Sequence, residues 1–272
     1  MRTSKILMTV LLVFSFPSIS LASETSYTKN QQKTITELFK ALASSNTDKI
    51  AVAQKKYVAS NSSAYYFVDM VRNHHSTVRY FKSINAYGLP SGTTPTPETS
   101  GKYKFSKNMV DFNSVVNEFD GIVTNIKFDK NGKISSWTMA DRSKNNSIKL
   151  SDRVTVISSK FEGSGFKVDM GYLFKQTDGK GFLQLQIKNI SPALKSWSYA
   201  GGQYGGPDAK YLSATSNPTG CLYPGQTAFI EAQINGYPLV AKNTDAVFDA
   251  PTFNGCGPGS TPASATLRFT TN

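Results

Sequence analysis

The chain has 272 residues, 39% of them hydrophobic and 12% aromatic, so it can bury a sizeable core and is not a largely disordered protein. Its formal net charge of +12 comes mainly from lysine, because arginine stands only at positions 2, 72, 79, 142, 153 and 268. Lysine suits long-range attraction to an anionic partner, and no nucleic-acid-binding motif accompanies it, so we expect no nucleic-acid partner.

Residues 1–22 have the pattern of a secretory signal peptide. Arg2 and Lys5 precede an apolar run over 6–16, which is too short to span a bilayer. Ser20 and Ala22 place small side chains at the −3 and −1 positions of a cleavage site. We therefore expect an exported protein, at the cell surface, in the periplasm or outside the cell, whose mature chain begins at Ser23 with a charge of +10 and has no transmembrane segment.

Two cysteines, Cys221 and Cys256, lie in the last quarter of the chain. In an exported protein an even pair predicts a disulfide, here closing a loop of 36 residues, worth about 4 kcal/mol in the chain-entropy model. No Cys-x-x-Cys motif is present and no histidine lies near either cysteine in sequence, so neither a redox motif nor a metal site is predicted there.

The first part of the chain has helical periodicity. Apolar residues between 28 and 43 recur at i, i+3, i+4 and i+7, which predicts one amphipathic helix. Thr47 is the expected N-cap of a second helix that runs to about Ala59. A third is expected to start after Ser62 or Ser63 and to continue toward Tyr80. The Pro/Thr-rich stretch 90–101 is predicted to be a loop.

From Tyr103 onward the periodicity changes to two, and we expect about three strands before residue 145. Alternation over 122–128 puts positions 122, 124, 126 and 128 on one face, and the turn at 129–132 leads into a returning strand over 133–139. Asp129 and Asn131 resemble the start of a calcium loop, but Ala140 stands where that loop needs an acidic residue, so a plain hairpin is predicted.

From position 152 the pattern is all-β, with turn signals between short strands, and it predicts a two-sheet sandwich. The glycine-rich stretch 201–207 is predicted to be a mobile loop. The expected strands are 153–161, 168–175, 182–189, 195–200, 210–216, 227–234 and 264–270.

The region after residue 150 resembles the immunoglobulin-like sandwiches of bacterial secreted proteins. The resemblance rests on the strand and Asn-x-Ser turn at 183–191, the loop and strand at 205–211, and the Pro-Gly turn within 222–228. It implies an immunoglobulin-like domain over 150–272.

The region 23–145 is similar to small α+β domains of the cystatin-like or SnoaL-like kind, through the helix connection at 41–48 and the closing hairpin at 128–137. The combination of residues 61–64 with a C-terminal sandwich resembles secreted proteins of actinobacterial type. Both families span unrelated functions, so the resemblance implies a fold and no activity.

No catalytic constellation is visible. His74 and His75 are the only histidines, and adjacent residues on a helix point too far apart to chelate one metal, so we interpret them as a polar segment at the C-terminal end of the third helix. No Gly-x-Ser-x-Gly motif occurs, and the acidic residues Glu162, Asp169 and Asp249 are scattered. We expect no catalytic residue, no metal and no cofactor, and therefore no enzyme.

The candidate ligand-binding residues surround the glycine-rich stretch 201–207. Aromatic side chains there can stack on sugars or anchor a protein partner, and two lysines flank them. The set is Trp197, Tyr199, Tyr204, Tyr211, Lys195 and Lys210.

The leading hypothesis is an exported, non-enzymatic binding protein that recognises an anionic cell-envelope polymer or another exported protein. The alternatives are an envelope-polymer hydrolase with a pocket in the α+β region, and a structural module in an assembly. A helix–sheet interface filled by Phe39, Leu42, Tyr66 and Trp137 would count against the hydrolase. Asn61, Asn145 and Asn189 begin N-glycosylation sequons.

Overall fold

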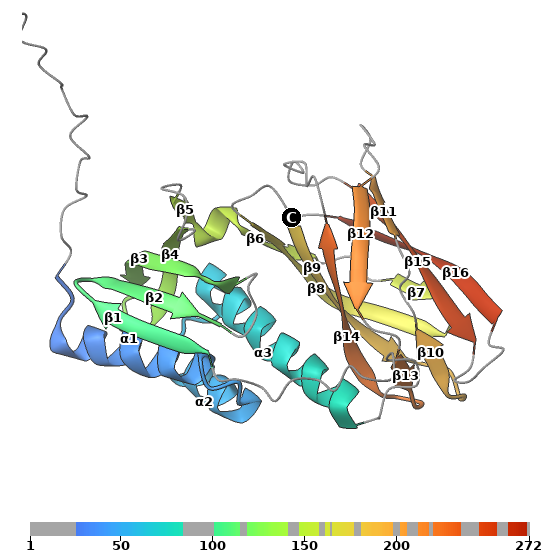
Figure 1. Ribbon diagram of the computed structural model, residues 1–272, viewed down its shortest axis with the longest axis horizontal. Coiled ribbons are helices and arrows are strands. Elements are labelled where there is room, and N and C mark those ends of the chain that lie inside the picture. Colours follow the sequence, from blue (N-terminus) through green and yellow to red (C-terminus); the bar gives the residue numbers. More distant parts are fainter. Residues whose placement is uncertain are drawn as a thin grey trace, which may run out of the picture.

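The computed structural model describes residues 26–83, 101–114, 119–140, 147–157, 161–163, 165–176, 181–197, 202–205, 212–217, 220–234, 245–254 and 261–270. Three helices and an antiparallel sheet are followed by an all-β region, which confirms the predicted fold class (Figure 1). The predicted signal peptide and the 90–101 loop lie outside the described residues. The helices are α1 (Lys29–Leu42), α2 (Thr47–Tyr57) and α3 (Ser63–Ser83).

The ends of the helices follow from capping side chains. Thr28 and Gln31 form a reciprocal capping box at the start of α1. At α2 the cap is Asn46, whose Oδ1 accepts hydrogen bonds from the backbone N–H groups of Asp48 and Lys49 at 3.1 Å. The prediction of Thr47 as the cap is wrong by one residue, because Asn46 has the extended backbone that aims its side chain at the first turn while Thr47 is already helical.

The first sheet has five strands in sequential order rather than the expected three or so. Its first hairpin turns through Lys107 and Asn108, which both have positive φ, as a tight two-residue turn requires. The predicted turn at 129–132 is confirmed, with Asp129 Oδ1 accepting from the backbone N–H groups of Asn131 and Lys133. The strands are β1 (Lys102–Ser106), β2 (Met109–Asn113), β3 (Gly121–Phe128), β4 (Ile134–Ala140) and β5 (Ser147–Lys149).

A bulge in β3 breaks the predicted alternation. Asn125 has a φ of 50°, and the pairing with β4 shifts between Thr124 and Lys127. Val123 and Ile126 are therefore the buried apolar side chains of the strand, instead of the residues at one set of even positions. A bulge inserts one residue and moves the following side chains to the other face, which strict periodicity does not anticipate.

The all-β region is one continuously paired sheet of 11 strands. Six of the seven predicted strands each correspond to one observed strand with shifted ends, and the seventh, 153–161, is divided into β6 and β7. The strands are β6 (Val154–Ile157), β7 (Phe161–Gly163), β8 (Phe166–Lys175), β9 (Gly181–Asn189), β10 (Lys195–Trp197), β11 (Gly202–Gly205), β12 (Leu212–Asn217), β13 (Gly220–Leu222), β14 (Thr227–Ile234), β15 (Asp245–Asn254) and β16 (Thr261–Thr270).

Three of these strands, β11, β13 and β15, were not expected from sequence. The interpretation of 201–207 as a loop is wrong for Gly202–Gly205, because β11 pairs with both β12 and β15. Long-range backbone hydrogen bonds override the weak strand propensity of glycine. The Asn-x-Ser turn after β9 is confirmed, since Asn189 Oδ1 accepts from the N–H and the hydroxyl of Ser191 at 2.9 and 2.7 Å.

The hydrophobic core runs from the helices into the second sheet. Phe67 of α3 is fully buried, and its ring centroid lies 5.2 Å from Trp137 of β4 and 5.7 Å from Phe174 of β8. Phe119 continues the cluster to Phe182 of β9 at 5.3 Å. Such aromatic pairs contribute about 1 kcal/mol each beyond the burial of their surface. In Figure 1, α3 extends from beneath the first sheet toward β14.

Candidate functional site

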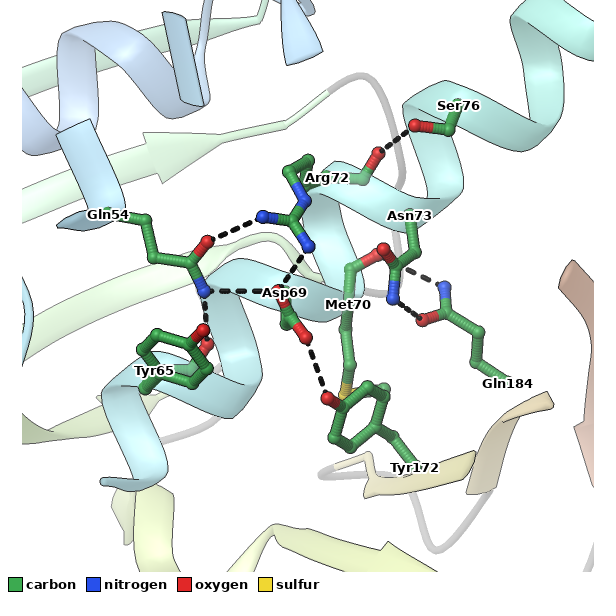
Figure 2. Close-up of polar contacts among 9 residues, drawn as sticks. All are labelled: Gln54, Tyr65, Asp69, Met70, Arg72, Asn73, Ser76, Tyr172 and Gln184. Carbon is green, nitrogen blue, oxygen red and sulfur yellow. Dashed lines mark hydrogen bonds and ion pairs between the residues drawn. The ribbon is translucent and has the colours of Figure 1, made fainter. Parts of the chain in front are cut away.

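The face of α3 that is turned toward α2 and β8 carries a buried carboxylate, Asp69. Its Oδ1 lies 2.7 Å from the Arg72 guanidinium and accepts a hydrogen bond from Gln54 Nε2 at 3.1 Å, while its Oδ2 accepts one from the Tyr172 hydroxyl at 2.7 Å (Figure 2). Gln54 also accepts from Arg72 at 2.9 Å and donates to the carbonyl of Tyr65. A carboxylate that accepts this many bonds tolerates burial.

One turn further along α3, a second set of polar residues meets β9 and β14. Asn73 Nδ2 donates to Gln184 Oε1 at 3.1 Å, and Gln184 Nε2 donates to the Met70 carbonyl (Figure 2). Gln184 Nε2 also donates to Glu231 Oε1. His74 Nδ1 lies 2.7 Å from Glu231 Oε2. Together with the Asp69 set, these contacts form what we call the α3 seam, defined by Gln54, Asp69, Arg72, Asn73, His74, Tyr172, Gln184 and Glu231.

The electrostatics of the seam keep Tyr172 neutral. Its pKa is raised, first by burial and then by the negative charge of Asp69 and by the hydrogen bond that the hydroxyl donates to that carboxylate. The neutral phenol therefore remains a hydrogen-bond donor through the ordinary pH range. The seam is a set of satisfied bonds joining α3 to α2 on one side and to the second sheet on the other.

A second feature is an open groove of about 560 Å³ between α1 and α2. The lining residues of each helix lie on one helix face, with i, i+3 and i+4 spacing. The residues lining the groove are Glu37, Lys40 and Ala41 of α1, Ser44 just after α1, and Asp48, Lys49, Val52, Ala53, Lys56 and Tyr57 of α2.

The groove differs from the seam in how its charges are held. Within the part of the chain that the structure describes, no groove lysine forms an ion pair. The ammonium of Lys56 lies 5.0 Å from the centre of the Tyr57 ring. Val52 is 67% exposed, although it is an apolar, β-branched residue on a helix.

The ligand-binding residues predicted from sequence are only partly placed. Trp197 pairs with Thr252 and Tyr204 with Phe248, so both lie along β15, and Lys195 lies in β10. Tyr199, Lys210 and Tyr211 lie outside the described residues. The predicted binding role of this set stays a prediction, as does the disulfide, since Cys221 lies in β13 and Cys256 lies outside the described residues.

The interpretation of His74 and His75 as a polar segment at the C-terminal end of the third helix is wrong, because α3 continues to Ser83. Both lie in the middle of α3; His75 is 1% exposed and His74 contacts Glu231. Sequence reasoning also missed Asp69, Tyr172 and Gln184. One signal was available, because Asp69 and Asn73 are polar residues four apart within the otherwise apolar face of α3.

The described residues hold no group of three or more side chains suited to a metal ion. None of the described helices is long and apolar enough to cross a membrane.

Comparison with known proteins adds little. No protein-family model matches the chain, and no curated protein matches it. Among solved structures, the GAE domain of GGA2p from Saccharomyces cerevisiae aligns over 41% of this chain and 95% of that domain, with 15% identity and a TM-score of 0.28. A likeness this weak carries no argument about fold or function.

Proposed function

We propose that the protein is an exported, non-catalytic binding protein that holds an acidic partner protein through its α+β region. The distribution of charge carries this proposal. Residues 23–150 contain 18 Lys and Arg against 10 Asp and Glu, whereas residues 151–272 contain 10 against 8. Nearly all of the positive excess therefore belongs to the helices and the first sheet, away from the loop that sequence favoured as the ligand site.

The basic residues of this region are available to a partner. Its exposed lysines occur on α1, on α2, on strands β1, β3 and β5, and at two turns of the first sheet. They are Lys29, Lys33, Lys40, Lys49, Lys55, Lys56, Lys102, Lys104, Lys107, Lys127, Lys130 and Lys149. A surface with one dominant sign raises the rate at which an oppositely charged partner associates, and the effect falls with ionic strength.

The groove favours a protein over an anionic polymer as the partner. Glu37 and Asp48 line it together with the lysines, and Val52 and Tyr57 give it apolar surface. A uniform polyanion would be repelled by the carboxylates and would gain nothing from the apolar side chains, whereas a protein segment can match both signs and cover the valine.

The packing of the α+β region weighs against the hydrolase alternative. Phe39, Leu42 and Trp137 are each at most 1% exposed, and Tyr66 packs against the same core. These are the side chains that would have to leave space for a substrate pocket between helices and sheet.

Two finer assignments belong with this proposal. The charged start, short apolar run and small residues of 1–22 support export. Three helices on an antiparallel sheet support a cystatin-like or SnoaL-like kinship for the first region. The antiparallel pairing of the strands in the second region supports the immunoglobulin-like kinship.

The test is retention of the protein on the producing cell's isolated envelope across a salt series, with and without prior protease treatment of the envelope. We expect retention at low salt that falls steeply as salt rises and disappears after protease treatment. Retention that survives protease would assign the partner to the envelope polymer instead. No retention at low salt would refute the proposal.

A further inference from the structure

We infer that the groove between α1 and α2 is the docking site for an acidic helical segment with an apolar residue at its centre. This inference rests on the proposed function and names the surface and the chemistry of the partner. Two neighbouring helices with a groove between them can receive a third helix along that groove, and anchors at i, i+3, i+4 and i+7 are typical of this mode of recognition.

The spacing of the lysines sets the spacing of the partner's carboxylates. Lys49 and Lys56 are seven residues apart on α2, so they lie on one face about 10 Å apart along the helix axis. A partner helix with two acidic residues seven positions apart places one carboxylate beside each ammonium. Lys40 of α1 faces the groove from the other helix and adds a third positive charge.

The centre of the groove is apolar. Val52 lies between Lys49 and Lys56 in sequence and on the same face, and Ala41 and Ala53 line the groove beside it. Val52 has the largest exposed fraction of the large hydrophobic residues that the structure describes, at 67%. A leucine of the partner helix, placed between its two acidic residues, would remove that valine from water.

Among the described residues, the lysines that line the groove form no ion pair with the neighbouring carboxylates, Glu37 and Asp48. The Asp69–Arg72 pair is held at 2.7 Å inside the protein, and in contrast no groove lysine is paired with Glu37 or Asp48. These lysines are exposed and form no ion pair with the carboxylates near them. They can therefore pair with a ligand without breaking an ion pair inside the protein.

The experiment measures the affinity of a fluorescein-labelled helical peptide of about four turns that has two glutamates seven positions apart and one leucine between them. The groove variant carries Lys40→Glu, Lys49→Glu and Lys56→Glu. Its matched control, the sheet variant, carries Lys102→Glu, Lys104→Glu and Lys127→Glu, which makes the same change of charge at exposed positions outside the groove.

We expect the groove variant to lose at least about tenfold in affinity and the sheet variant less than about threefold, because only the first removes short-range pairs. Val52→Ser should weaken the leucine peptide about fivefold and leave a serine-for-leucine version of the peptide unaffected. The control for that change is Met109→Ser, at a partly exposed apolar position on β2. Unchanged circular dichroism verifies the fold of each variant.

The outcomes separate this inference from the proposed function. Equal losses in the groove and sheet variants, with envelope retention intact, would overturn the groove and leave the basic region as the binding surface. Equal binding of the leucine peptide and the serine version would overturn the apolar anchor. No binding of the peptide to the wild-type protein would overturn the inference alone, and the further loss of salt-sensitive envelope retention would overturn the proposed function too.

Discussion

The α3 seam and the α1–α2 groove contain similar charged and polar side chains, but those of the seam are bonded to one another, whereas the groove lysines form no ion pair within the described part of the chain. In the seam, Asp69 is buried and bonded to Arg72, Gln54 and Tyr172. In the groove, lysines and carboxylates line an open channel without pairing. The difference indicates that the seam serves the stability of the protein, while the groove has charge left over for a partner.

This contrast predicts that seam variants reduce stability and that groove variants reduce binding. The largest effect is expected at Asp69. Asp69→Ala removes a carboxylate that three side chains contact, and it should lower the free energy of unfolding by about 3 kcal/mol, because breaking a buried ion pair leaves its other partner unsatisfied. The Arg72 side chain is 31% exposed, so water can solvate the unpaired guanidinium, and the expected loss lies at the low end of the range for broken buried ion pairs. Urea denaturation measures it.

The control for Asp69 is Asp152→Asn, a change at an exposed carboxylate on a short 3-10 turn (Leu150–Asp152). It should alter the free energy of unfolding by less than about 0.5 kcal/mol. Equal effects at the two positions would mean that the seam contributes no particular stability.

Tyr172→Phe removes one hydrogen bond to Asp69 and keeps the ring. We expect a loss of about 2 kcal/mol at neutral pH, as is typical of a bond to a charged group. The variant should also change the alkaline limb of the stability profile, since burial and Asp69 raise the pKa of the Tyr172 hydroxyl.

The sign follows from linkage. The folded-state pKa of Tyr172 is above the unfolded value of about 10, so its contribution is fully present below pH ~10 and is lost as pH rises toward the folded-state pKa. Burial raises the pKa of Tyr27 as well, but Tyr27 is present in both proteins, so its contribution cancels in the comparison. Wild type should therefore lose stability above pH ~10 more steeply than Tyr172→Phe, and parallel curves from urea titrations would contradict the assignment.

The contact between His74 and Glu231 tests whether the seam holds the two regions together. A double-mutant cycle with His74→Ala and Glu231→Ala should give a coupling energy of about 1.5 kcal/mol, because the pair is close and mostly buried. Thermal or urea unfolding of the four proteins measures it. A coupling energy near zero would mean that this pair adds nothing to the contact between α3 and β14.

The smallest effect concerns the wall of the groove. Asn46→Ala should lower the free energy of unfolding by about 1 kcal/mol, since it removes the N-cap of α2. Thr47→Ala should have a smaller effect, because Thr47 is the first helical residue and not the cap. Urea denaturation measures both losses. A larger loss for Thr47→Ala than for Asn46→Ala would support Thr47 as the N-cap, as predicted from sequence.

The sequence predicted the elements whose determinants are local. The i, i+3, i+4 spacing of Ile35, Leu38 and Phe39 marks α1, and the turn built on Asp129 marks the β3–β4 hairpin. The bulge at Asn125 was missed because it depends on pairing with β4 rather than on the residues of β3.

The seam and the groove depend on contacts between residues far apart in the chain. Asp69 and Tyr172 are 103 positions apart, and nothing in the local sequence of either indicates the other. The groove could be predicted in part, since the spacing of Lys49, Val52 and Lys56 is visible in the sequence. Its other wall depends on how α1 packs against α2.

The most direct test of the contrast is to measure both properties on two proteins, the Lys40→Glu, Lys49→Glu, Lys56→Glu groove variant and Asp69→Ala. The account predicts that the groove variant keeps its free energy of unfolding within about 1 kcal/mol of wild type and loses at least about tenfold in peptide affinity. It predicts the opposite for Asp69→Ala, which should lose stability and retain affinity while folded. A groove variant that unfolds more easily and binds the peptide normally would contradict it.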